Sequence, residues 1–148
     1  MLTPDEARDF RRLAGLMIPA DAASGAPGAD DAAIFADILR SLGRDLDAVR
    51  GGLADLRATV GGALADQDDQ AAETAAFAFL GAGGAAAGAI GRAVLQCYYR
   101  DDRVVRALGL EPRPPFPLGH KLEAGDFGLL DAVRGRPPMW RDVDGRGA

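Results

Sequence analysis

The chain has 148 residues, 48% of them hydrophobic, a formal net charge of −5 at pH 7 and a sequence pI of about 4.8. This length suits one domain with one core, and the acidic balance gives no general electrostatic attraction to nucleic acids or anionic membranes. Because Cys97 is the only cysteine, a disulfide within the chain is excluded.

The first predicted element is a helix that begins after Thr3. Thr3 is followed by Pro4 and then by Glu6, which is the arrangement of a capping box with proline at the first helical position. Apolar residues recur on one helical face as far as Met17, and Pro19 ends the helix. The opening residues contain no basic and apolar leader and no twin-arginine signal. We therefore expect a cytoplasmic location, with co-export to the periplasm beside a partner as the alternative.

Two further helices are predicted before residue 61. Residues 19–31 have the composition of a loop, and an aspartate at its end can cap a helix whose apolar stripe covers residues 34–42. Residues 46–60 carry apolar side chains at spacings of three and four, which predicts a third helix. This helix is expected to continue through Gly51 and Gly52, although each glycine costs roughly 1 kcal/mol there.

Residues 74–91 contain no charged side chain and approach the length of a membrane span. Most of them are alanine or glycine, so a buried helical hairpin with its turn at residues 81–84 is favoured over a span. We interpret the acidic residues before this segment, Asp68 and Asp69 among them, as helix caps rather than general acids. The second helix of this hairpin, the fifth of the chain, runs over about residues 85–100. Three of its glycines are expected to let a neighbouring backbone approach closely; they are Gly84, Gly88 and Gly91.

A short sixth helix is expected after Asp101 or Asp102, with Gly109 ending it. Tyr98 and Tyr99 precede it and permit two interpretations. The rings can pack together at a helix end beside a capping aspartate, or they can form a surface cluster that meets a partner. The sequence leaves both open, since one does not exclude the other.

Regular structure is mostly not expected from residue 110 onward. The stretch PRPPFPLGH at residues 112–120 holds four prolines and the only histidine of the chain. Residues 127–134 can form about two helical turns with their apolar side chains inward. The large apolar residues of this tail must be buried, either on the chain's own helices or on another subunit. The predicted organisation is therefore an all-α, bundle-like domain of five or six helices at residues 1–109, followed by an extended arm at 110–148.

Catalytic and metal chemistry have weak support in the sequence. Cys97 lies inside a predicted helix, where a small buried packing residue is the favoured interpretation. No second histidine or cysteine stands at a metal-ligand spacing, and no glycine-rich phosphate loop is present. The rival hypothesis is a stand-alone helical enzyme in which His120 acts with Asp126 or Asp131. A second rival is a homo-oligomeric scaffold whose tail is buried in its own copies.

Three blocks of the chain resemble the gluconate 2-dehydrogenase subunit 3 family. They are LTPDEARDFRRLAGLMIPAD at residues 2–21, YYRDDRVVRALGLEPRPPFPLGH at 98–120 and DFGLLDAVRGRPPMWR at 126–141. They occur in the family's order. The family consists of the small subunits of bacterial flavin-dependent sugar and alcohol dehydrogenases.

The resemblance implies a non-catalytic subunit that binds no cofactor or metal itself. In such complexes FAD and catalysis belong to a large subunit of the glucose–methanol–choline (GMC) oxidoreductase class, and a cytochrome c subunit is a common electron acceptor. The small subunit supports the folding or export of the large one. The arm is then expected to wrap the large subunit, with Phe116 and Trp140 as anchors that each contribute about 2 kcal/mol or more.

The predicted partner interface joins the end of the fifth helix to the proline-rich stretch and the last aromatic residue. Its members are Tyr98, Tyr99, Asp101, Arg113, Pro114, Pro115, Phe116, Pro117, His120, Asp131, Arg134, Trp140 and Arg141.

Overall fold

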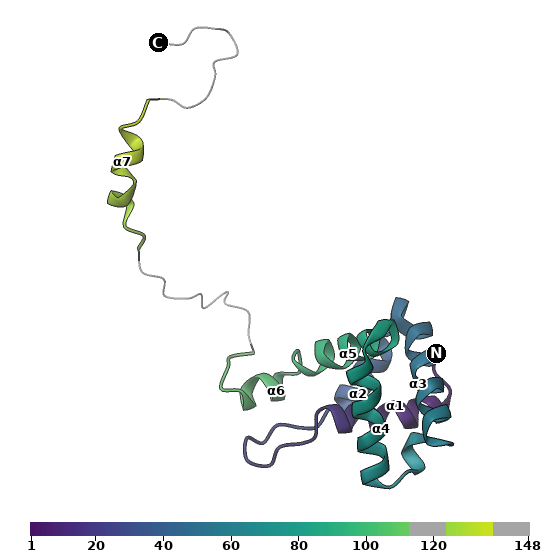
Figure 1. The fold of residues 1–148 in the computed structure, drawn as a ribbon. Helices are drawn as coiled ribbons and strands as arrows, with labels where there is room; N and C mark the ends of the chain where they lie inside the picture. The colour runs from purple at the N-terminus through teal and green to yellow at the C-terminus, as the bar shows by residue number, and fades with distance from the viewer. Residues whose placement is uncertain (113–123, 138–148) are drawn as a thin grey trace, which may run out of the picture. The chain divides into compact units, whose positions relative to one another are not determined.

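The computed structural model describes residues 1–112 and 124–137 (Figure 1). The chain divides after residue 113 into a helical unit and a second unit. The described residues of the helical unit form α1 (Pro4–Met17), α2 (Ala32–Ser41), α3 (Leu46–Val60), α4 (Asp69–Ala82), α5 (Gly84–Tyr98) and α6 (Asp102–Ala107), with the 3₁₀ turns η1 (Gly43–Asp45) and η2 (Leu64–Asp66). Those of the second unit form η3 (Phe127–Leu130) and α7 (Asp131–Arg134).

The all-α prediction is confirmed for the described residues, which contain seven α-helices and no strand. Four helices begin at a side-chain cap, provided by Thr3, Asp31, Asp68 and Asp101. The predicted capping box is complete, because the Glu6 amide donates to Thr3 Oγ1 at 3.2 Å and the Thr3 amide donates to Glu6 Oε2 at 2.7 Å. Local sequence therefore set the starts of these helices.

The core of the helical unit lies where α3 and α5 pack together, with α2 against α5 and with α1 and α4 against α3. Its fully buried side chains come from all of these helices and from η2; the largest are Phe10, Leu13, Ile34, Ile38, Val49, Leu53, Leu56, Leu64, Ile90 and Val94. Phe10 of α1 meets Phe35 of α2 edge to face, with 5.7 Å between ring centroids. One bundle-like domain results.

The break between α4 and α5 is shorter than the sequence predicted. The α4 helix continues through Ala82, and the turn is confined to Gly83 and Gly84, with φ of +73° and +92°. Such values strain any residue other than glycine. Among the described residues no single helix is long and apolar enough to cross a membrane, although α4 and α5 pass that test as a pair, bent by 110° at their break.

Close helix packing occurs at a different glycine from those predicted. A Cβ built on Gly52 of α3 would lie 2.9 Å from Phe79 Cζ, 3.1 Å from Ala86 Cβ and 3.2 Å from Ile90 Cδ1. At Gly84 and Gly91 an added Cβ would meet nothing within 4 Å. At Gly88 it would meet only Arg92 of the same helix. The expectation for those three glycines was therefore wrong within the described chain, because their face of α5 is turned away from the core.

Candidate functional site

The junction between α5 and α6 holds the described part of the predicted interface. Tyr98 is only 5% exposed and belongs to the core, whereas Tyr99 is 55% exposed. The two rings meet edge to face with centroids 5.2 Å apart. Asp101 caps α6 by accepting from the Arg103 amide at 2.9 Å. The packing interpretation of this junction is thus confirmed, and contact of Tyr99 and Asp101 with a partner stays a prediction.

Arginine–aspartate pairs surround this junction. Arg103 binds both Asp31 and Asp101, with closest oxygens at 2.7 and 2.9 Å. Arg100 donates to Asp37 Oδ2 and also to Ser41 Oγ at 2.7 Å. The hydrogen bonds from Arg103 hold the pKa values of Asp31 and Asp101 below the ordinary aspartate value. Stability from this cluster is therefore present above that value and is lost as the pH falls through the lowered pKa values.

A polar pocket of about 390 Å³ lies beside these pairs. It is lined by residues of α2, α5, the α5–α6 connection and the start of α6, namely Ala33, Ile34, Asp37, Arg40, Cys97, Arg100, Asp101 and Asp102. Cys97 itself is 1% exposed, and burial raises the pKa of its thiol. A raised pKa keeps the sulfur as a neutral thiol, whereas a nucleophilic cysteine needs the thiolate. The structure thus confirms Cys97 as a buried packing residue.

In the native chain, Cys97 is expected to react with a disulfide reagent at least about 100-fold more slowly than in urea, because both the raised pKa and burial suppress attack. The measurement is the rate of thiol modification followed by absorbance, with the urea-unfolded chain as the control. Similar rates in the two states would show an accessible thiolate and would contradict this assignment.

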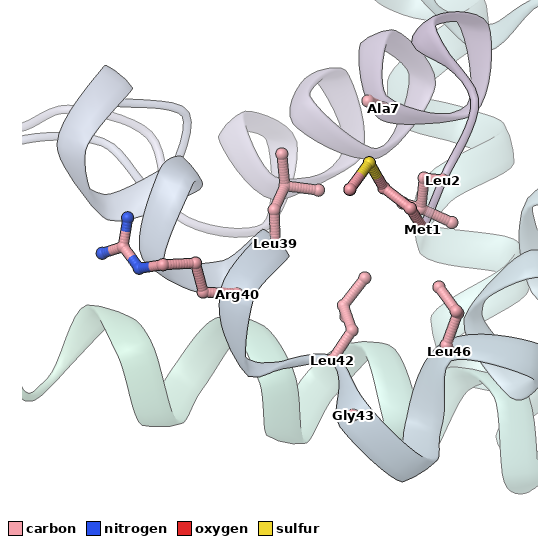
Figure 2. Close-up of a pocket in the computed structure, with 8 residues that line it drawn as sticks. All are labelled: Met1, Leu2, Ala7, Leu39, Arg40, Leu42, Gly43 and Leu46. Carbon is pink, nitrogen blue, oxygen red and sulfur yellow. The ribbon is translucent and has the colours of Figure 1, made fainter.

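An apolar pocket of about 500 Å³ lies between the N-terminus and the α2–α3 connection (Figure 2). It is lined by Met1, Leu2, Ala7, Leu39, Arg40, Leu42, Gly43 and Leu46. Figure 2 shows the leucine side chains directed toward Met1, while the guanidinium of Arg40 extends away from them. This volume lies in the range of small-ligand pockets, and the lining suits an aliphatic group. Sequence reasoning missed the pocket, since its walls come from three separate segments.

A buried ion pair also escaped the sequence analysis. Asp9 of α1 is 1% exposed and accepts from Arg57 Nε of α3 at 2.5 Å. Its second carboxylate oxygen accepts from the Ala65 amide of η2 at 3.0 Å. The hydrogen bond to Asp9 raises the pKa of the Arg57 guanidinium. The pair joins three elements of the helical unit and is best explained as structural, because all acceptor oxygens face the chain's own donors.

Three aspartates lie at or just before the start of α4, and one of them is the helix cap that the sequence predicted. The other two form ion pairs with α1. Asp68 caps α4 by accepting from the Ala71 amide at 2.8 Å. Asp69 pairs with Arg12 of α1 at 2.5 Å, and Asp66 pairs with Arg8 at 3.1 Å. Asp69 therefore fastens α1 to the start of α4, and Asp66 fastens α1 to η2. A group of three or more residues suited to hold a metal ion is not found among the described residues.

The second unit forms the two turns predicted for residues 127–134, but its apolar side chains do not point inward. The exposed fractions are 65% for Phe127, 78% for Leu129, 46% for Leu130 and 54% for Val133. The expectation of inward side chains is thus wrong within this unit, since so short a segment has no core of its own to bury them.

The two acidic residues described in the second unit have partners within it. Asp126 accepts from the Gly128 amide at 3.0 Å, and Asp131 pairs with Arg134 at 3.0 Å. Both were candidates to act with His120 in the rival enzyme hypothesis. The remaining predicted interface residues lie outside the described residues: Arg113, Pro114, Pro115, Phe116, Pro117, His120, Trp140 and Arg141.

Comparison with models of known protein families, with curated proteins and with solved structures finds no match to this chain.

Proposed function

We propose that this chain is a non-catalytic small subunit of a flavin-dependent sugar or alcohol dehydrogenase complex. Its role is to stabilise or assist the maturation of a large subunit of the GMC class, which carries FAD and the active site. The family resemblance adds a cytochrome c subunit as a third member. The proposal rests on the three sequence blocks that resemble the small-subunit family, together with the surface of the second unit.

The observation that carries the proposal is the row of exposed apolar side chains in residues 127–134. Leu129 and Phe127 are the most exposed of them, and both lie within one of the family-like blocks. Clusters of exposed apolar side chains mark protein–protein contacts when no core covers them. A large subunit that binds this segment would bury these side chains, so the second unit supports a partner-binding role.

The state of the titratable groups supports a non-catalytic role. The Cys97 thiol is buried with a raised pKa, and the carboxylate of Asp131 is paired with Arg134. The aspartates that line the polar pocket are each paired with an arginine: Asp37 with Arg100, Asp101 with Arg103 and Asp102 with Arg106. Each of these groups is engaged in holding the fold, and a general acid or base needs a free proton site aimed at a substrate.

The direct test is co-purification with a GMC-type flavoprotein, which is first sought among the products of the genes that neighbour this one. An isolated gene with no such neighbour would weaken the proposal. Tagged full-length chain is co-expressed with that protein, and the eluate is scanned for the absorbance of bound flavin. We expect a flavin-containing complex, and we expect the chain purified alone to be colourless and inactive. A chain that self-associates and captures no flavoprotein would contradict the proposal and support the homo-oligomeric scaffold.

Within this complex, Leu129→Ser is expected to weaken capture of the flavoprotein by about tenfold or more, the scale of losing one apolar interface anchor. Because Leu129 is 78% exposed, the substitution should leave the isolated chain folded. The measurement is quantitative pull-down at graded concentrations, with helicity of each variant checked by circular dichroism.

The matched control for this variant is Ala132→Ser, which places the same hydroxyl in the same exposed segment without removing a large apolar side chain. Capture by the control should equal that of the wild type. Deletion of residues 111–148 should abolish capture. Full capture by the deleted chain would show that the anchor lies in the helical unit instead.

A further inference from the structure

The helix α6 has a small apolar attachment to the helical unit. Val104 is its one buried side chain, at 1% exposed. The residues after it, Leu108 and Leu110, are 55% and 61% exposed. A six-residue helix is marginal by itself, because helix nucleation needs tertiary support. Side chains other than Val104 must therefore contribute to holding α6 in place.

Arg103 makes the polar attachment. Its Nη2 donates to Asp31 Oδ1 at 2.7 Å, and its Nη1 donates to Asp31 Oδ2 at 3.3 Å. The same guanidinium binds Asp101 through Nε at 3.0 Å and Nη2 at 2.9 Å. Both carboxylates are helix caps, because Asp31 accepts from the Ala33 amide at 3.0 Å at the start of α2. One side chain thus joins the N-terminal caps of two helices.

Neither Arg100 nor Arg106 ties α6 to α2 as Arg103 does. Arg100 precedes α6 and binds Asp37 and Ser41 of α2, so it fixes the end of α5. Arg106 lies on α6 but pairs with Asp102 one turn away, at 3.2 Å. Among the ion pairs of the described residues, the one between Arg103 and Asp31 is the pair that ties α6 itself to another helix.

We propose that Arg103 is a reversible latch that holds α6 on the N-terminus of α2 and so sets the direction in which residues 108–112 leave the bundle. The Arg103 side chain is 46% exposed and the Asp31 side chain is 28% exposed, so solvent and salt reach the pair. Exposed ion pairs are individually weak and are screened by salt. Opening the latch therefore releases α6 and residues 108–110 while the core formed by α1 to α5 stays folded.

The test is amide hydrogen exchange in the full chain, read by NMR. The amides of Val105, Leu108, Gly109 and Leu110 are hydrogen-bonded within α6 and its C-terminal turn. Arg103→Gln removes two exposed ion pairs and is expected to speed their exchange by about threefold or more, while the amides of Ile90 and Val94 in α5 keep the wild-type rate. Arg106→Gln removes an equal charge from the same helix and should change these rates by less than about twofold.

Two further measurements distinguish a latch from a general loss of helix stability. Asp31→Asn keeps an N-cap acceptor for α2 but removes the charge that faces Arg103, so it should reproduce the fast exchange at α6 with α2 unchanged. Salt at about 1 M should speed exchange at α6 in the wild type and have little effect in Arg103→Gln. Wild-type rates in Arg103→Gln, or equal acceleration in α5 and α6, would overturn the latch. The exchange experiment uses this chain alone, without a flavoprotein. Its result therefore tests the latch even if the proposed function is wrong.

Discussion

Replacing Asp9 by leucine is expected to lower the free energy of unfolding by about 3 kcal/mol, the lower part of the range for breaking a buried ion pair. The variant leaves Arg57 Nε and the Ala65 amide without their acceptor. Arg57 Nη2 is already buried without a hydrogen-bond partner among the described residues, so the guanidinium has few other acceptors nearby. Because the Arg57 side chain is 34% exposed, partial hydration keeps the loss from being larger.

The measurement is urea unfolding of the isolated chain, followed by circular dichroism. The control is Asp55→Ala, which removes an exposed aspartate from α3 and should change stability by less than about 0.5 kcal/mol. The double variant Asp9→Leu with Arg57→Met should regain much of the loss, since apolar replacements of a buried pair are often neutral. A single variant as stable as the wild type would show that the pair contributes nothing.

Replacing Gly52 by leucine is expected to destabilise the helical unit by about 1–3 kcal/mol, because added side-chain atoms enter a filled space. Even a Cβ there would lie 3.1 Å from Ala86 Cβ, which cannot move without its backbone. Leucine has a better helix propensity than glycine, so the loss arises in spite of a local gain. Thermal unfolding followed by circular dichroism measures the difference.

The adjacent glycine provides the matched control, since a Cβ on Gly51 would meet nothing within 4 Å. Gly51→Leu should stabilise the chain by roughly 0.5–1 kcal/mol through helix propensity alone. Opposite signs at two identical neighbouring residues would locate the close contact between α3 and the α4–α5 pair. Equal effects at both positions would show that this contact is not present in solution.

The candidate site was predictable only where its residues act on their own neighbours. The role of Asp101 as a cap depends on residues within one turn, so the local pattern predicted it. Cys97 was predicted to be buried from its place inside a helix beside Tyr98, although the residues that bury it lie in other helices. The partner of Asp31 was not predictable, because Arg103 lies 72 positions away and every arginine in the sequence was an equal candidate. The apolar pocket in Figure 2 was missed for the same reason.

The sequence by itself determined the helix starts and the fold class of the described residues. A capping side chain such as Thr3, and the apolar spacing after it, act through hydrogen bonds and contacts within three or four residues, so they can be read in order along the chain. The sequence also placed apolar side chains in residues 127–134, which have no core there to bury them.

Only the tertiary structure decided which equivalent residues do different work. Gly52 lies against three side chains of α4 and α5, whereas Gly51 faces open space. Asp9 is buried against Arg57, while Asp55 stays on the surface. In each case the deciding contact joins segments far apart in the sequence. Such contacts depend on the angles at which the helices cross, and these angles cannot be predicted from composition or local periodicity.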